Sequence, residues 1–208
     1  MYRPKAYVQD DIAALHALIG KRSFALIATV IEGRPEFAYA PVVLGAQGSK
    51  GSARFHLALA NPLSHLDGAA VRLSFLGPDA YVSPDWYVTE GLVPTWNYAA
   101  VEASGVARRL ERSALLQLLA DLSAQEEERL KPKKPWTLDK VPEARLEALV
   151  NAIVGFSVEF ETLEGKLKLS QDKKPEDFDG VVRALETKGG ASLEVAKAMR
   201  DVAQKRSL

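Results

Sequence analysis

Short runs in which apolar and polar residues alternate dominate the first half of the chain and predict β-strands. In residues 53–60, Phe55 and Leu57 fall on one side of an extended backbone, and Arg54 and His56 fall on the other. The links between the runs are short, which favours antiparallel pairing into a closed or half-closed barrel. The strands predicted for this half are two within residues 24–44, which meet at a Glu32-Gly33 turn, followed by residues 53–60, 71–77, 80–88 and 96–110.

Helical spacing of apolar residues appears before these strands and again after them. The first helix is predicted over residues 10–20, with Asp10 or Asp11 as its N-cap and Gly20 as its stop. The composition changes near Glu111, where leucines begin to recur on one side of an amphipathic helix. The later helices are predicted over residues 111–130, after Pro142, and over residues 175–189 and 192–208, the last two separated by Gly189-Gly190.

Residues 154–170 return to a strand pattern, and we expect them to complete the barrel. The predicted fold is therefore α+β but mainly β, an antiparallel barrel decorated by helices. We expect a barrel domain over residues 1–170, with a helical insertion at about residues 111–150. Residues 171–208 are expected to form a C-terminal helical extension.

Composition narrows the class of protein further. The 208 residues carry 27 basic and 27 acidic side chains, so the net charge of zero argues against direct DNA binding. The absence of cysteine excludes disulfides, thiolate nucleophiles and cysteine-bound metals. No apolar run is long enough for a signal peptide or a membrane span. We expect a cytoplasmic protein that does not contact a membrane.

The common catalytic and metal-binding motifs are missing. The chain has no glycine-rich phosphate loop and no G-x-S-x-G nucleophile motif. Its three histidines, His16, His56 and His65, do not have the spacing of metal ligands. We therefore predict neither a catalytic residue nor a metal site.

Aromatic residues are concentrated between positions 81 and 98, where two of the three tryptophans lie. They admit two interpretations: packing of a barrel or a dimer interface, or a slot for a planar ligand such as a flavin. Thr95, Asn97 and Ser83 would supply the few polar groups that such a slot needs. The aromatic residues are Tyr81, Trp86, Tyr87, Trp96 and Tyr98.

Several longer motifs give the chain a family resemblance. The stretches "GPDAYVSPDWY", "VPTWNYAAV", "AIVG" and "LEGKLKLSQDK" resemble, in order and spacing, the PaiB-type proteins, which are FMN-binding negative transcriptional regulators. "MYRPKAY", "LANP" and "DFDGVVRAL" match as well, so the resemblance runs from residue 1 to about residue 185. It implies a split β-barrel like that of flavin reductases and pyridoxamine oxidases. It also implies a homodimer with FMN at the subunit interface and a role in repressing genes.

The resemblance also implies which residues bind the cofactor. By position, Thr95, Trp96 and Asn97 would line the flavin ring or its ribityl chain. His56 and Asn61 would lie at the strand end that holds the phosphate, although Asn61 has the alternative role of capping a short helix. The matched residues of the last strand, which would supply a phosphate or rim contact, are Lys168, Ser170 and Gln171.

The chain departs from the family pattern at several positions. Leu59 stands where relatives have an arginine that could pair with a phosphate. Glu102 and Ser104 stand where histidines are usual, as do Tyr39 and Glu126. Three functions therefore remain open. The first is a flavin-binding regulator. The second is a split-barrel dimer that has lost flavin binding and acts through protein interactions. The third is a flavin-dependent reductase or oxidase of small molecules.

Overall fold

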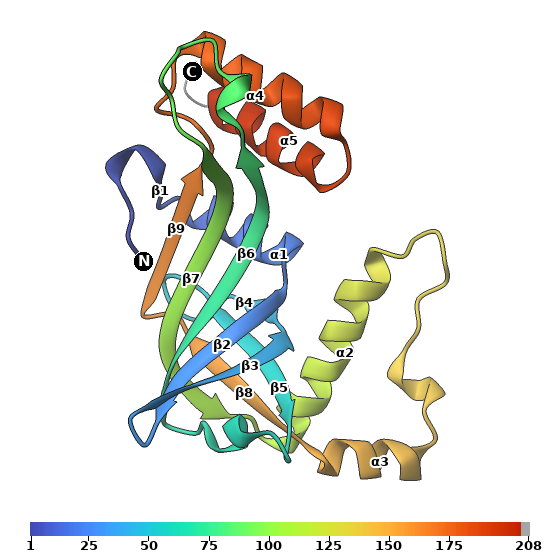
Figure 1. The fold of residues 1–208 in the computed structure, drawn as a ribbon. Coiled ribbons are helices and arrows are strands. Elements are labelled where there is room, and N and C mark those ends of the chain that lie inside the picture. Colours follow the sequence, from blue (N-terminus) through green and yellow to red (C-terminus); the bar gives the residue numbers. More distant parts are fainter. Residues whose placement is uncertain (205–208) are drawn as a thin grey trace. The chain divides into compact units, whose positions relative to one another are not determined.

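The computed structural model describes residues 1–204, and the chain forms two units whose segments are interleaved. The first unit contains Met1–Leu15, Leu76–Val101 and the chain from Glu164 on, and the second contains His16–Phe75 and Glu102–Leu163. Two long strands, β6 (Ala70–Val82) and β7 (Thr95–Arg109), belong to both units (Figure 1). The expected boundary between a barrel domain over residues 1–170 and a C-terminal helical extension over residues 171–208 stays a prediction.

The second unit is an antiparallel barrel. Its strands follow the order β3-β2-β6-β7-β8-β5-β4, and contacts between β3 and β5 bring the two ends of this order together. Phe55 and Phe156 are cross-strand partners whose rings pack 5.7 Å apart inside it. The strands not yet bounded are β2 (Phe24–Ile31), β3 (Arg34–Pro41), β4 (Val43–Gly45), β5 (Ser52–Ala58) and β8 (Ile153–Glu159).

The predicted hairpin turn between β2 and β3 is confirmed. Ile31 pairs with Arg34, and Glu32 and Gly33 between them have φ of 50° and 76°. Two consecutive residues with left-handed backbone form a tight turn, and the twist of such a turn matches the twist of the two strands that it joins. The turn sets the register that alternates the side chains of β2 between the barrel interior and the surface.

Helices cover part of the second unit. Helices α2 (Arg112–Glu128) and α3 (Glu143–Asn151) lie near the predicted positions. Their apolar sides form a core of their own against β4, which includes Val43, Leu118 and Val150. Helix α1 (Ile12–Lys21) starts as predicted, because the Asp11 carboxylate accepts a hydrogen bond from the Ala14 amide at 2.7 Å.

The first unit carries the other strands and the terminal helices. Strand β1 (Val8–Gln9) pairs with β9 (Thr162–Lys168), and β9 pairs with β7. Helices α4 (Pro175–Lys188) and α5 (Ala191–Gln204) lie side by side (Figure 1). Their core contains Val82, Leu169, Val181, Leu185 and Met199. Residues 205–208 of the predicted last helix lie outside the described residues.

Three predicted strand boundaries are wrong. Residues 71–82 form one strand, not two, and this strand ends before Pro84, which opens a short 3₁₀ helix, Pro84–Trp86. Proline has no amide hydrogen for a sheet ladder, and Ser83 caps the turn by accepting from the Asp85 amide at 3.3 Å. Residues 154–170 form two strands, which separate at residues 160–161. No helix among the described residues is long and apolar enough to span a membrane.

Candidate functional site

The first unit contains a hollow of about 170 Å³ near the start of β7 and the end of β9. Two of the motif regions named from the sequence meet there: the loop before Thr95 and the turn after Lys168. One wall is apolar and the rest is polar or charged. The lining residues are Tyr7, Tyr87, Leu92, Val93, Pro94, Thr95, Asn97, Lys168, Ser170, Asp172 and Lys173.

Asn97 and Ser170 hold the floor of this hollow together. Asn97 is 1 % exposed, and its Nδ2 lies 2.9 Å from Ser170 Oγ, which in turn lies 3.1 Å from Asn97 Oδ1. Ser170 has a φ of 62°, a left-handed conformation that costs free energy in any residue with a Cβ atom. The pairing with Asn97 therefore secures a strained turn directly after β9.

Lys168 lies at the rim and is tied to the start of β7. Its Nζ donates to Thr95 Oγ1 and, at 2.7 Å, to the carbonyl oxygen of Trp96. An ammonium group has three hydrogens, so these two bonds leave one. Burial lowers the pKa of Lys168, and the nearby Asp172 carboxylate opposes that shift.

Asp172 is the acidic group of the hollow. Its Oδ2 accepts from Lys173 Nζ at 2.5 Å, and Tyr7 also bonds to it. Burial raises the pKa of the Asp172 carboxyl, but the bonds from Lys173 and Tyr7 outweigh burial, so the pKa is below its ordinary value. Burial, with the bond to Asp172, raises the pKa of Tyr7 to about 12.

Tyr87 contributes a polar atom without a partner. Its Oη is buried and has no hydrogen-bond partner among the described residues, and burial raises the pKa of this phenol. A buried hydroxyl usually finds a partner, so this one is still able to bond to a group that enters the hollow.

A carboxylate on α4 anchors the loop that forms the apolar wall. Asp177 Oδ1 accepts from the amides of Val88 and Thr89, both at 2.8 Å. The hydrogen bond from the Thr89 amide is the largest cause that lowers the pKa of Asp177, and the bond from the Val88 amide lowers it further. Gly180 permits the close approach, because a Cβ atom there would lie 2.1 Å from the Trp86 carbonyl oxygen.

The structure brings four of the eight predicted binding residues to this hollow: Thr95, Asn97, Lys168 and Ser170. Trp96 points away from Asn97 along the same strand. It is 54 % exposed and meets Tyr81 edge-on with ring centroids 6.1 Å apart. Gln171 is used locally, since its side chain accepts from the Leu169 amide at 2.7 Å and donates to the Leu167 carbonyl oxygen.

His56 and Asn61 belong to the second unit and do not line the hollow. Asn61 caps a short 3₁₀ helix, Pro62–His65, by accepting from the Leu63 amide at 2.9 Å, which is the alternative role that the sequence allowed. His56 has a buried Nδ1 without a partner among the described residues, and burial lowers its pKa.

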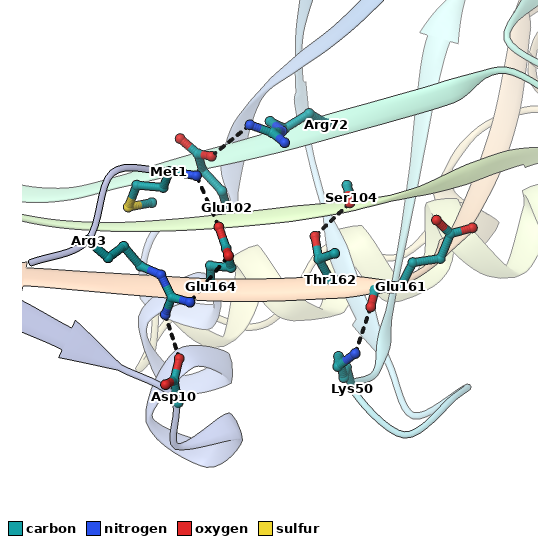
Figure 2. A network of polar contacts seen from close by, with 10 residues as sticks. All are labelled: Met1, Arg3, Asp10, Lys50, Arg72, Glu102, Ser104, Glu161, Thr162 and Glu164. Atoms are coloured by element: carbon teal, nitrogen blue, oxygen red, sulfur yellow. Dashed lines mark hydrogen bonds and ion pairs between the residues drawn. The ribbon is translucent and has the colours of Figure 1, made fainter. Parts of the chain in front are cut away.

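Two of the unusual residues of this chain take part in contacts within the second unit (Figure 2). Glu102 lies 3.3 Å from Arg72 in an ion pair, and Ser104 lies 2.6 Å from the hydroxyl of Thr162. In the first unit, Figure 2 shows Glu164 between the amino group of Met1 and the guanidinium of Arg3. The negative charge of Glu102 is therefore partly balanced by Arg72.

Sequence reasoning missed four polar residues of the site: Tyr7, Asp172, Lys173 and the loop anchor Asp177. The first three lie in the stretches "MYRPKAY" and "LEGKLKLSQDK", whose match to the family was the only signal for them. Their mutual contacts join positions 7 and 172, and no local pattern indicates such a pairing.

The fold is a split β-barrel, and comparisons with known proteins agree. The FAD and heme binding protein from Mycobacterium smegmatis matches with a TM-score of 0.58 at 17% identity, over 83% of this chain and 79% of that one. The flavocytochrome Anf3 from Azotobacter vinelandii matches with a TM-score of 0.60 at 14% identity, over 86% of this chain and 78% of that one.

Sequence comparison then places the chain within this class. A family model described as "Putative FMN-binding domain" matches residues 1–162, and the chain belongs to that family. The protease synthase and sporulation protein PAI 2 of Bacillus subtilis is 29% identical over 208 residues, 99% of each chain. The uncharacterized protein AN0679 of Emericella nidulans is also 29% identical, over 91% of this chain and 92% of that one. The predicted resemblance to the PaiB-type proteins is confirmed.

Proposed function

We propose that this protein binds a flavin, FMN in the first place, and acts as a regulator of the PaiB type. Membership of the FMN-binding family over residues 1–162 is the observation that carries the proposal. When bound, FMN supplies a ring that accepts and returns electrons. The chain's own part is to bind this ring, to orient it and to keep water away from it.

The hollow supports this proposal by its chemistry. It combines an apolar wall at Leu92, Val93 and Pro94 with hydrogen-bonding groups at Thr95 and Lys168, which is the composition typical of a cofactor pocket. Its volume suits one ring and is too small for a whole flavin. The rest of the flavin would lie outside the hollow, and Trp96, whose side chain points away from Asn97, does not line it.

The remaining predicted residues take different roles in this proposal. Asn97, Ser170 and Gln171 position the walls, because their polar atoms are used within the protein. His56 and Asn61 stay candidates for the phosphate end by family position alone. With Leu59 in place of an arginine, the phosphate has no bidentate partner there, so we expect FMN to bind only modestly better than riboflavin.

The homodimer is part of the same proposal. The surface side of the β2–β3 hairpin exposes Phe24, Phe37 and Tyr39, which are 64 %, 56 % and 67 % exposed. The rings of Phe24 and Tyr39 stack 6.2 Å apart. An apolar sheet surface of this kind is typical of a protein interface, and a second copy of the chain is the partner that the family suggests. Light scattering on the wild type and on Phe37→Glu would test it, with a dimer and a monomer expected.

The regulatory role rests on the family resemblance and on the printed name of the Bacillus relative, which refers to protease synthesis and sporulation. The zero net charge argues against direct operator binding, so we favour action through a protein partner. A gel shift at low salt, repeated at high salt, distinguishes the two. A shift that survives high salt contradicts a purely indirect role.

The visible absorption spectrum of the purified protein is the experiment that tests flavin binding. We expect a yellow protein, or saturable quenching of FMN fluorescence on titration. A colourless protein that does not quench FMN contradicts the proposal and favours the alternative, a split barrel that has lost its cofactor. The ion pair of Glu102 and the hydrogen bond of Ser104, which use positions that relatives give to histidine, are the observations that favour this alternative.

A further inference from the structure

The size of the hollow limits which part of a ligand it can hold. A buried apolar cavity of about 150 Å³ accepts benzene, and the hollow measures about 170 Å³. It can therefore take one six-membered ring with small substituents, but not three fused rings with a ribityl phosphate.

The charges of the hollow disfavour the phosphate. Asp172 is ionised at neutral pH, since its pKa is below the ordinary value, and Lys173 is already paired with it. Lys168 is then the one cation among the lining residues without an ion pair, and the same Asp172 carboxylate lies near enough to raise its pKa. A phosphate dianion placed here would lie close to a carboxylate, whereas a neutral carbonyl oxygen would not be repelled.

The hydrogen-bonding groups of the hollow favour an acceptor. Lys168 has one hydrogen left after its bonds to Thr95 and Trp96, and Tyr87 Oη is unpartnered. Asn97 and Ser170 satisfy each other and offer nothing further. A ligand that brings carbonyl oxygens therefore matches the groups at the wall better than an apolar ring does.

We infer that this hollow takes the pyrimidine end of the flavin, with Lys168 and Tyr87 as donors to its carbonyl oxygens. The inference rests on the proposed flavin binding and adds the orientation of the ring. The two ends of the flavin ring differ in chemistry: the pyrimidine end carries two carbonyls and an N–H, and the opposite end carries only methyl groups. The polar hollow distinguishes them for that reason.

Two modified cofactors test the orientation directly. FMN methylated at N3 carries one extra methyl at the pyrimidine end, and 8-chloro-FMN is changed at the opposite end. In fluorescence titrations we expect N3-methyl-FMN to bind at least about tenfold more weakly than FMN, the effect of one methyl in a close-fitting pocket. 8-Chloro-FMN should bind within about threefold of FMN, because its altered end lies outside the hollow. The reverse order overturns the inference.

Substitutions identify the donors independently. Lys168→Met should weaken FMN binding about tenfold, the effect of losing a hydrogen bond from a charged group. Tyr87→Phe removes a single oxygen atom and should weaken binding by a smaller factor. Lys173→Met is the matched control, because that ammonium is already paired with Asp172, and its effect should be smaller than that of Lys168→Met.

The outcomes separate the two proposals. If the wild type does not bind FMN at all, the proposed function is wrong. If the wild type binds FMN but Lys168→Met and Tyr87→Phe bind it equally well and circular dichroism shows both folded, only the orientation is wrong. If either variant fails to fold, the comparison of N3-methyl-FMN with 8-chloro-FMN on the wild type still tests the orientation of the flavin ring.

Discussion

Asn97 on β7 and Ser170 after β9 exchange hydrogen bonds at 2.9 and 3.1 Å, although 73 positions separate them in the chain. Both are buried, and Ser170 is held in a left-handed conformation. The pair joins two strands at the floor of the hollow, so the shape of the site depends on it.

A double-mutant cycle measures the strength of this pair. Asn97→Ala should lower the free energy of unfolding by about 1–3 kcal/mol, because it leaves the Ser170 hydroxyl buried without a partner. Ser170→Ala should cost a similar amount, and the double variant should cost less than the sum by about 1 kcal/mol. Urea denaturation measures the free energy of unfolding of the wild type, the two single variants and the double variant. Strict additivity would mean that the two side chains do not interact.

Tyr7 should resist ionisation at high pH. Its pKa of about 12 follows from burial and from its bond to the ionised Asp172. In an ultraviolet titration to pH 11, the wild type and Tyr7→Phe should therefore show the same rise in phenolate absorbance. A smaller rise in Tyr7→Phe than in the wild type contradicts the prediction.

His56 should make the protein less stable in acid. Burial lowers its pKa in the folded state, so between the unfolded value of about 6.5 and the lower folded value only the unfolded state takes up the proton. Its contribution is present above the unfolded pKa and is lost as the pH falls towards the folded one. The unfolding free energy of His56→Leu should depend less steeply on pH between 7.5 and 5 than that of the wild type.

Urea denaturation of the wild type and of His56→Leu at each pH supplies the two slopes to be compared. If His56→Leu follows the wild type, burial of His56 has no energetic consequence.

Asp177 should govern the loop that forms the apolar wall of the hollow. Its carboxylate accepts from the Val88 and Thr89 amides, and a neutral amide in Asp177→Asn accepts more weakly. We expect hydrogen exchange at these two amides to become about tenfold faster and FMN binding to weaken. Because the folded pKa of Asp177 is lowered, the wild type should lose the same protection as the pH falls through that pKa.

Asp179 on the same helix is exposed, and Asp179→Asn serves as the control for a lost charge. It should leave the exchange of Val88 and Thr89 unchanged. Equal exchange in Asp177→Asn and the wild type would show that the loop does not depend on this anchor.

The barrel could be predicted from the chain because its signals are local. Alternation along residues 53–60 and the Glu32-Gly33 turn depend only on neighbouring residues, and both were found. The boundary errors at Pro84 and at residues 160–161 arose where one continuous pattern hides a change in pairing. An interruption by proline was visible, but whether a strand resumes after it depends on partners elsewhere.

The site was predicted only in part, for a physical reason. Thr95, Asn97, Lys168 and Ser170 were named from motifs and do line the hollow. Tyr7 and Asp172 were not named, because their roles come from a contact between distant segments. The family motifs also could not indicate that the side chains of Gln171 and Asn61 form hydrogen bonds with nearby backbone amides.

The amino-acid sequence by itself determined the class of fold, the family and the absence of cysteine chemistry, because periodicity, motifs and composition are properties of the chain. Only the tertiary structure decided which polar groups remain available to a ligand. Asn97 and Lys168 look equally suited to bind a cofactor in the sequence, yet one is saturated by Ser170 and the other keeps a free hydrogen. That difference is set by partners more than 70 positions away, and hydrogen bonds over such separations form only when the strands pair.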